Sequence, residues 1–203
     1  MKKYRKLIGV SLCLTLSVCF VIGMLFGVDG IAAVRQKTGG VLNGLCEIAE
    51  YSRFGYIAEP SAVADLRAIC ADAFKFMRDD CAANGIVLEN RVTDETLVYV
   101  KPHGLENAIT NIIINAIEHA DCTSVVLSVE CAKNRIMLEI ADNGKGISEN
   151  IDVFGPYVSE NVGTTNSGLG LYISKSIVQS MNGELSYRSN SDGTVFRISL
   201  MRA

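Results

Sequence analysis

"NIIINAIEHA", residues 111–120, places two asparagines four positions apart in a stretch otherwise rich in isoleucine and alanine. In a helix, positions four apart differ by about 40° around the axis, so Asn111 and Asn115 share one face. Apolar residues recur at intervals of three and four on the opposite face, which predicts a helix packed on a core; they are Ile109, Ile112, Ile113, Ala116, Ile117 and Ala120. Because asparagine is a poor helix former, the pair indicates either a solvated face or a binding role.

The composition limits the classes of function. The chain has 203 residues, enough for one sizeable domain and an appendage. Its net charge is −3 and its aromatic residues are few, so no basic surface favours nucleic acid. Its seven cysteines show no metal-ligand spacing. That pattern is typical of a reduced cytoplasmic protein rather than of a disulfide framework.

The N-terminal region contains an uncharged apolar run at residues 7–28, preceded by the basic sequence "KKYRK". At 1.5 Å per residue the run reaches about 33 Å, which is long enough to cross a bilayer. A cleaved signal peptide is the alternative, because "GIA" at residues 30–32 is a tolerable cleavage site. We favour a retained membrane helix because the run is longer than a usual signal-peptide core.

The remaining pattern alternates between helical and strand periodicity. We expect helices over 41–54, from a cap at Ser61 to about Asn84, from about His103 to Ala120, and from near Gly168. The apolar stripe of the second helix is Val63, Leu66, Ile69, Ala73, Phe76 and Met77. Strands are predicted over 85–92, 96–101, 123–132, 135–142, 183–189 and 194–200. This mixture predicts a two-layer α/β sandwich with a mixed sheet.

Two glycine motifs follow the asparagine helix. "DNGKGI", residues 142–147, comes directly after a predicted strand, and its glycines would let a ligand approach the backbone, although "NG" also marks ordinary turns. "GLGL", residues 168–171, opens a predicted helix whose N-terminal amides could bind phosphate. The polar stretch between them, residues 154–167, has the length and composition of a lid.

Together and in this order, these pieces resemble the ATP-binding domain of sensor histidine kinases, over residues 60–203 and more loosely over 41–59. "NIIINAIEH" is similar to the family's asparagine box, "DNGKGI" to its first glycine box, "VFGPY" to its phenylalanine box and "SGLGLYISKSIV" to its second glycine box. "DGTVFRISL" matches its closing strand. The resemblance implies a Bergerat-type fold, a mixed sheet covered by three helices, as in gyrase.

The resemblance also implies roles for individual residues. Asn115 would give its side-chain oxygen to Mg²⁺, and Asn111 would face the same nucleotide. Asp142 would accept a hydrogen bond from the adenine amino group, and Gly144 and Gly146 would let the base lie against the backbone. Further contacts with ATP are implied for Ile147, Gly168, Leu169, Gly170, Leu171 and Thr194, with Gly168 and Gly170 offering amides to the phosphates.

The amide at position 111 distinguishes branches of the superfamily. Gyrase-like ATPases carry a glutamate there to activate water, whereas an amide cannot take up a proton. Asn111 therefore favours phosphoryl transfer to a protein over hydrolysis. Many kinases have a lysine or arginine where this chain has Glu118, so Lys145 and Lys175 are the alternative cations for the γ-phosphate.

The phosphoacceptor histidine box of a histidine kinase is missing from these 203 residues. Only His103 and His119 occur, and neither sits in such a box. We expect a membrane segment at 1–33, a linker and dimerisation-helix remnant at 34–59, and the ATP-binding catalytic domain at 60–203. The expected protein is a truncated, membrane-attached kinase that cannot phosphorylate itself in cis. A response regulator or a partner histidine kinase is its expected partner, and a homodimer is an option.

The orientation of the membrane segment poses a problem. Four basic residues precede it, against Arg35 and Lys37 after it, so the positive-inside rule would export the rest of the chain. A single-pass cell-membrane protein with a cytoplasmic ATP-binding domain requires that this rule be overridden, or that the chain derive from a longer kinase. Two alternatives remain, a non-catalytic ATP-binding module that regulates a signalling partner, and an exported or inert remnant.

Overall fold

The computed structural model describes residues 56–92, 94–148, 151–155, 158 and 168–203. In this part of the chain, helices and strands follow one another in a mixed order. They are β1 (Ala62–Asp65), α2 (Leu66–Ala83), β2 (Val87–Asn90), β3 (Leu97–Val100), α3 (Pro102–His119), β4 (Ser124–Cys131), β5 (Arg135–Asp142), α4 (Gly170–Ser180), β6 (Glu184–Asn190) and β7 (Gly193–Met201).

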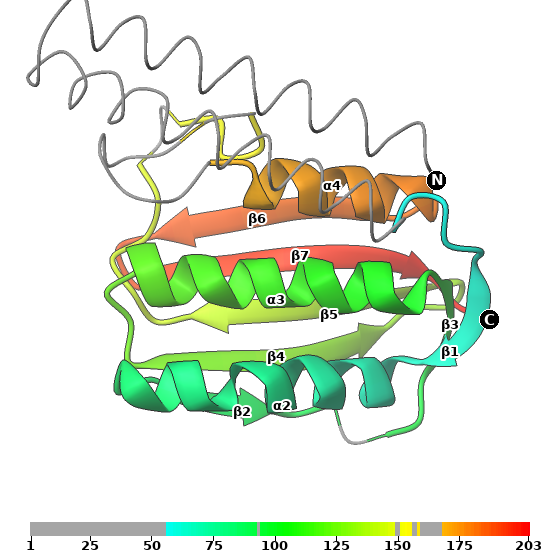
Figure 1. The fold of residues 1–203 in the computed structure, drawn as a ribbon, viewed down its shortest axis with the longest axis horizontal. Coiled ribbons are helices and arrows are strands. Elements are labelled where there is room, and N and C mark those ends of the chain that lie inside the picture. Colours follow the sequence, from blue (N-terminus) through cyan, green and yellow to red (C-terminus); the bar gives the residue numbers. More distant parts are fainter. Residues whose placement is uncertain (1–55, 93, 149–150, 156–157, 159–167) are drawn as a thin grey trace, which may run out of the picture. The chain divides into compact units, whose positions relative to one another are not determined.

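The strands form a five-stranded sheet in the order β2-β4-β5-β7-β6, with a separate two-stranded sheet of β1 and β3. β2 and β4 are parallel, whereas the other neighbouring strands are antiparallel. Helices α2, α3 and α4 lie side by side over one face of the larger sheet (Figure 1). The predicted two-layer sandwich with a mixed sheet and three helices is confirmed.

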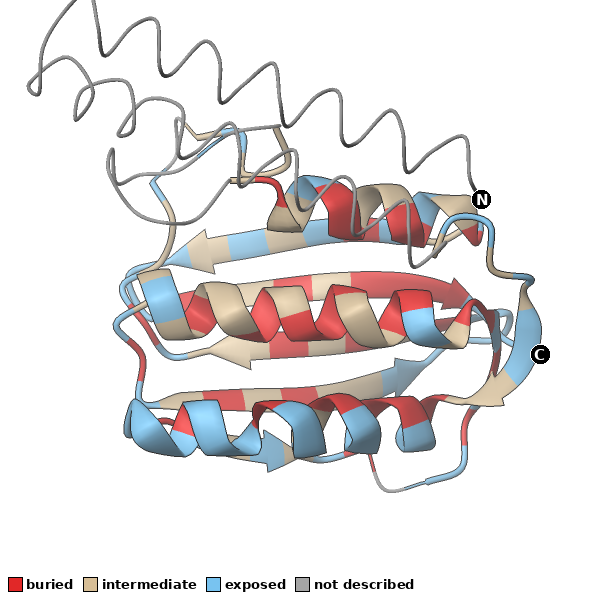
Figure 2. Cartoon of the chain, viewed as in Figure 1, coloured by how far each residue is buried: buried red, intermediate tan, exposed pale blue. Residues whose placement is uncertain are grey.

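The core lies between the sheet and the helices because each element alternates in polarity. On β5, Ile136, Leu138 and Ile140 are buried, while the residues between them face away from the helices. On α3, four residues of the predicted apolar face are buried, and the last two, Ile117 and Ala120, are partly buried. The buried four are Ile109, Ile112, Ile113 and Ala116. Figure 2 shows the buried residues where helices and sheet face each other. Burying each such side chain contributes about 1.5–3 kcal/mol.

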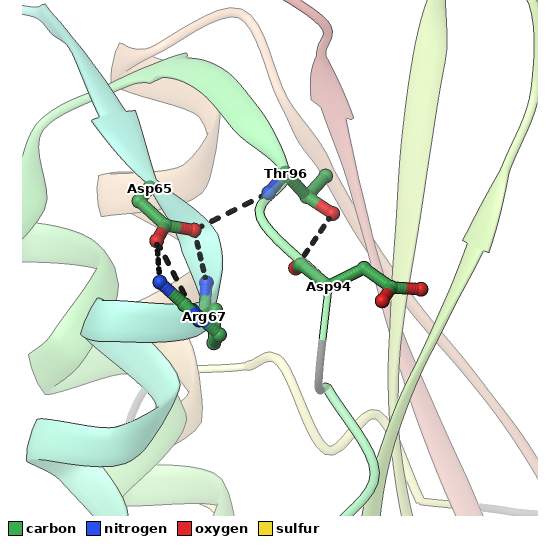
Figure 3. Close-up of polar contacts among 4 residues, drawn as sticks. All are labelled: Asp65, Arg67, Asp94 and Thr96. Carbon is green, nitrogen blue, oxygen red and sulfur yellow. Dashed lines mark hydrogen bonds and ion pairs between the residues drawn. The ribbon is translucent and has the colours of Figure 1, made fainter.

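The start of α2 corrects the predicted helix at Ser61. Residues 62–65 form β1, which pairs with β3, and the helix begins at Leu66. The cap is Asp65, whose Oδ1 accepts a hydrogen bond from the Arg67 backbone N at 3.0 Å and from the Thr96 backbone N at 3.3 Å (Figure 3). A carboxylate that serves two amides fixes both the helix start and the approach to β3, which Ser61 cannot do.

Two members of the predicted stripe of α2 are not in the core. Val63 belongs to β1 and is 58% exposed, and Phe76 is 70% exposed on α2. The other members are buried: Leu66, Ile69, Ala73 and Met77. Phe76 lies on α2 as predicted, but at the edge of the apolar stripe, where its ring faces solvent.

The N-terminus of α3 is held by the segment that leads into the domain. The Glu59 carboxylate accepts hydrogen bonds from the backbone N of His103 at 3.2 Å and of Gly104 at 3.0 Å. The Lys101 ammonium donates to the Ile57 carbonyl. A carboxylate at a helix N-terminus satisfies unpaired amides and the helix dipole, so these contacts fix the end of α3.

Within the described residues, no helix is both long enough and apolar enough to span a bilayer. The predicted membrane helix at 7–28 and the predicted helix at 41–54 lie outside the described residues.

Candidate functional site

The asparagine face of α3 contacts the first turn of α4. Asn111 donates through Nδ2 to the Gly170 carbonyl at 3.3 Å and to the Ser174 Oγ at 3.2 Å. Asn115 donates through Nδ2 to the Asn111 backbone carbonyl at 2.7 Å. The two asparagines therefore lie at the junction of α3 and α4, on the side of α3 away from the core.

These contacts fix which way each amide points. A backbone carbonyl can only accept a hydrogen bond, so the amino group of each asparagine must face its carbonyl partner. The side-chain oxygen then faces the other way. Within the described part of the chain, neither the Asn111 Oδ1 nor the Asn115 Oδ1 accepts a hydrogen bond, so both oxygens are available to a ligand.

The start of α4 brings together four of the predicted residues. Gly168 has a positive φ of +66° and Leu169 is buried, so the chain turns sharply into the helix at Gly170 and Leu171. The N-cap residue of this helix, Leu169, has an apolar side chain that accepts no hydrogen bond from the first turn. In contrast, Asp65 caps α2 and Glu59 binds the first amides of α3.

Asp142 stands at the end of β5 and is anchored by one oxygen. Its Oδ1 accepts hydrogen bonds from the backbone N of Gly144 at 2.9 Å and of Thr194 at 3.2 Å. Among the described residues, no hydrogen bond reaches its Oδ2, which leaves that oxygen for a donor on a ligand. Burial raises the pKa of this carboxyl above its ordinary value of 3.8, while the hydrogen bonds from the Gly144 and Thr194 amides oppose the rise.

The glycines around Asp142 are packed against backbone. A Cβ on Gly144 would lie 2.1 Å from the Ala120 carbonyl oxygen, and one on Gly146, which has φ +78°, would lie 2.1 Å from the Asn190 carbonyl oxygen. A Cβ on Gly193 would lie 2.0 Å from the Asp142 carbonyl oxygen. These distances are far below van der Waals contact, so only glycine allows the loop to meet both α3 and the β6–β7 hairpin.

Ile147 and Thr194 meet through a hydroxyl that the sequence did not single out. The Ile147 backbone N donates to the Ser189 Oγ at 2.8 Å, and the Ser189 Oγ lies 2.9 Å from the Thr194 Oγ1. Thr194 is 2% exposed, so its contacts with the rest of the site are those of its backbone N and its buried hydroxyl.

The two lysines suggested for the γ-phosphate have different surroundings. Lys145 Nζ forms an ion pair with Asp121 at 2.9 Å. Lys175 Nζ lies 4.6 Å from the centroid of the Phe154 ring, a cation–π distance. Phe154 belongs to the predicted phenylalanine box, whose last residues, 156–157, lie outside the described residues, as does most of the predicted lid.

The histidines occupy the two ends of α3. His103 is exposed in the first turn, with Nδ1 3.8 Å from the Glu106 Oε2. His119 ends the helix, with Nε2 3.8 Å from the Glu118 Oε2. Among the described residues, neither histidine forms a hydrogen bond or ion pair with Asn111, Asn115 or Asp142.

Helix α3 joins the parts of the site. Its middle contacts α4 through Asn111, and its C-terminal end contacts the loop after β5, where the Lys145 backbone N donates to the Ala120 carbonyl at 2.8 Å. The predicted residues thus fall into a loop side, around Asp142, and a helix side, around the start of α4. Asn115 lies on α3 one turn beyond Asn111, toward the end that meets the loop.

Sequence reasoning missed Ser174 and Ser189, whose hydroxyls bind site residues. Ser174 is buried, and its hydroxyl donates to the Gly170 carbonyl at 2.9 Å. Its spacing of four from Gly170 in an apolar helix was the available signal. Ser189 carried no comparable signal, because its partners lie across a hairpin and beyond the next loop.

The fold and the arrangement of these residues define an ATPase-type α/β sandwich. The model of the histidine kinase-, DNA gyrase B- and HSP90-like ATPase family matches residues 100–203, about half of the chain. The chain belongs to this family, and the resemblance to the ATP-binding domain of sensor histidine kinases is confirmed.

Known relatives are sensor kinases. The chain is 29% identical over 190 residues to the C4-dicarboxylate transport sensor protein DctB of Rhizobium meliloti (strain 1021), and the match covers 86% of this chain but only 28% of that protein. Among solved structures, it is similar to the histidine kinase AdeS of Acinetobacter baumannii, with a TM-score of 0.65, 20% identity and coverage of 95% of this chain and 97% of that chain. It is also similar to full-length ShkA in complex with AMPPNP, with a TM-score of 0.69, 18% identity and coverage of 98% and 46%.

Proposed function

We propose that this chain binds Mg-ATP and transfers its γ-phosphoryl group to a histidine of a partner protein in two-component signalling. The observation that carries the proposal is the series of polar groups along α3. An acceptor oxygen of Asp142 lies at the loop side, the amide oxygens of Asn115 and Asn111 lie along the helix, and the first turn of α4 lies at the other side. A nucleotide presents an amino group, a cation-bridged phosphate chain and terminal phosphate oxygens in that order.

The loop side fits the adenine base. Asp142 is held by two amides through Oδ1, so its Oδ2 can accept a hydrogen bond from an exocyclic amino group. The glycines at 144 and 146 leave backbone without side chains beside it, which suits a flat ring. A carboxylate accepts and does not donate, so it favours adenine over guanine, which presents a carbonyl oxygen at the corresponding position.

The chemistry of Asn115 fits Mg²⁺. Its Nδ2 is committed to the Asn111 carbonyl, which leaves a neutral, hard oxygen facing away from the core. Mg²⁺ is commonly held by one or two protein oxygens together with substrate phosphates and water. When bound, the ion would neutralise charge on the phosphates and bridge them.

The helix side fits the phosphates. The amides at the start of α4 point out of the helix end, and the dipole of the helix favours an anion there. Asn111 lies beside this turn and carries no group that takes up a proton, so it does not activate water. We therefore favour transfer to a protein over hydrolysis.

The acceptor would be supplied by another chain. The 203 residues contain no phosphoacceptor box, and the two histidines of α3 lie away from the site contacts. The match to DctB covers 28% of that protein. We propose a partner histidine kinase as the source of the acceptor histidine, with a response regulator downstream. We further propose attachment to the cell membrane through residues 7–28, with the ATP-binding domain in the cytoplasm and a homodimer as an option.

A labelling experiment tests the transfer. The full chain, purified in detergent, is incubated with γ-labelled ATP and Mg²⁺, alone and with a sensor kinase that keeps its acceptor histidine but whose own ATP site has been disabled by mutation. We expect acid-labile label on the partner kinase and none when Asn115→Ala replaces the wild-type chain. If neither chain carries label although this chain still binds ATP, the proposed phosphoryl transfer would be excluded.

A second function is favoured by the missing acceptor box. A chain that binds ATP without transferring phosphate could regulate a kinase or another signalling partner through its nucleotide-bound state. It would bind Mg-ATP with the same residues and leave no label in the experiment above. Nucleotide-dependent binding to the partner kinase would then identify it.

A further inference from the structure

The loop after β5 and the hairpin between β6 and β7 meet backbone against backbone. A Cβ on Gly146 would collide with the Asn190 carbonyl, and a Cβ on Gly193 would collide with the Asp142 carbonyl. Each segment therefore places a glycine where the other segment comes closest. Side chains that bridge such a contact determine how firmly the loop is held.

Ser189 forms one of these bridges. Its Oγ accepts a hydrogen bond from the Ile147 backbone N at 2.8 Å, lies 2.9 Å from the Thr194 Oγ1 and donates to the Gly193 carbonyl at 3.3 Å. A hydroxyl has one proton and two acceptor sites, so all three contacts are satisfied together when Thr194 donates to Ser189. The Ser189 hydroxyl therefore uses its one donor and both of its acceptor sites, and its bond to Ile147 joins the loop to the hairpin.

A second bridge shares a partner with the first. Asp142 Oδ1 accepts from the Thr194 backbone N, and the Thr194 hydroxyl contacts Ser189. The path runs from Ile147 through Ser189 and Thr194 to Asp142, so it closes a ring around the loop that contains Gly144 and Gly146. Among the described residues, removing the Ser189 hydroxyl would leave the Ile147 amide and the Thr194 hydroxyl without a hydrogen-bond partner.

We infer that Ser189 is a positioning residue, whose hydroxyl locks the loop 143–147 onto the β6–β7 hairpin and so holds Asp142 ready for the base. This inference rests on the proposed function, because it assigns to Ser189 a part in adenine binding. A loop that already has its bound conformation strengthens binding, because it loses less conformational entropy when the ligand binds.

Three variants of the full chain in detergent test the inference. Ser189→Ala removes the hydroxyl, and Ser189→Thr retains it with a side chain that suits a strand. Ser191→Ala is the matched control, because Ser191 is exposed on the same hairpin and contacts only its neighbour Asp192, at 3.5 Å, among the hydrogen bonds of the described residues. If Ser189→Ala does not fold, Ser189→Cys replaces it, with similar volume and a weaker acceptor.

Two measurements separate the lock from the function. Hydrogen exchange at the Ile147 amide, without nucleotide, reports the contact itself. Equilibrium dissociation constants for ATP and GTP report its consequence. We expect Ser189→Ala to accelerate exchange at Ile147 and to weaken ATP binding about five- to tenfold, with less discrimination against GTP. Ser189→Thr should restore both, and Ser191→Ala should change neither.

The outcomes are distinguishable. Exchange at Ile147 that is as slow in Ser189→Ala as in Ser191→Ala would overturn the inference, whatever the affinity. Faster exchange with unchanged ATP affinity would confirm the contact but overturn the role of Ser189 in positioning Asp142 for the base. A wild-type chain that binds no ATP would remove the proposed function and, with it, the assignment of Ser189 to base recognition, while the exchange rate would still decide whether Ser189 locks the loop.

Discussion

The two sides of the site are built differently. On the loop side, Asp142 is fixed by amides, and the glycines touch neighbouring backbone, so a methyl group at 146 would have no space. On the helix side, a Cβ on Gly170 would lie 3.9 Å from the Asn111 Cγ, an ordinary contact, and the N-cap residue of α4 has an apolar side chain. Under the proposed function, the closely packed loop side would recognise a rigid base by shape, whereas the more open helix side would bind the phosphates.

The largest effect is expected from Gly146→Ala on the loop side. The substitution combines a positive φ with a clash against the Asn190 carbonyl, and we expect a loss of about 2–4 kcal/mol in unfolding free energy together with loss of ATP binding. Gly85→Ala is the matched control, because Gly85 has φ +70° with nothing within 4 Å. It should cost only about 1 kcal/mol. Denaturant unfolding of both variants measures the difference, and equal losses would show that the loop is not packed as described.

The next effect is expected from Asp142→Asn. The side-chain oxygen can still accept from the Gly144 and Thr194 amides, but the outward oxygen becomes an amino group that cannot accept from adenine. ATP should bind at least about tenfold more weakly, as expected for the loss of a hydrogen bond to a charged group. Asp192→Asn, on the exposed hairpin, is the control for loss of charge, and calorimetric titration is the measurement.

Asp142→Asn should weaken ATP binding but leave the folded state as stable as the wild type or more stable. Burial raises the pKa of Asp142 above its ordinary 3.8, so the folded chain binds the proton more tightly than the unfolded chain. Stability is therefore lost as the pH rises from about 3.8 through the raised pKa, and above that window the carboxylate is charged at a cost. Asp142→Asn should melt at the same temperature as wild type or higher at pH 7. A clearly lower melting temperature would contradict this account of burial.

The smallest effect on the fold is expected from Gly170→Ala on the helix side. The methyl group has room beside Asn111 and the position has no positive φ, so stability should be unchanged or up to about 1 kcal/mol higher. If phosphates approach the first amides of α4 closely, ATP should bind roughly tenfold more weakly. Thermal melting and ATP titration on the same sample measure both, and full affinity in this variant would place the phosphates elsewhere.

Most of the fold could be predicted because hydrophobic periodicity is a local signal. The alternation of apolar and polar residues along β5, and the apolar and asparagine faces of α3, predict the two-layer sandwich. The error at Ser61 arose because β1 has four residues and is defined by pairing with β3, more than thirty positions away. Apolar residues in such a short strand match a helical stripe equally well, as Val63 did.

Candidate site residues could be chosen from the sequence where a residue type alone suggests the chemistry. An acidic residue before two glycines, and asparagines in mid-helix, indicate a ligand because they weaken the local structure. Ser189 and Ser174 could not be found in this way, since a serine in a strand or a helix is unremarkable until its partners are known. The contacts of Glu59 with the start of α3 also depend on residues more than forty positions apart.

Calorimetric titration of the full chain with ATP, with and without Mg²⁺, compared with Asn115→Ala, tests the central claim most directly. Asn107→Ala, one turn before Asn111, is the control, because Asn107 Oδ1 accepts from Asn111 and is not offered to a cation. We expect Mg²⁺ to strengthen ATP binding in the wild type and in the control. In Asn115→Ala that dependence should disappear while the melting temperature stays the same. Unchanged Mg²⁺-dependent binding in Asn115→Ala, or no ATP binding by the wild type, would contradict the account.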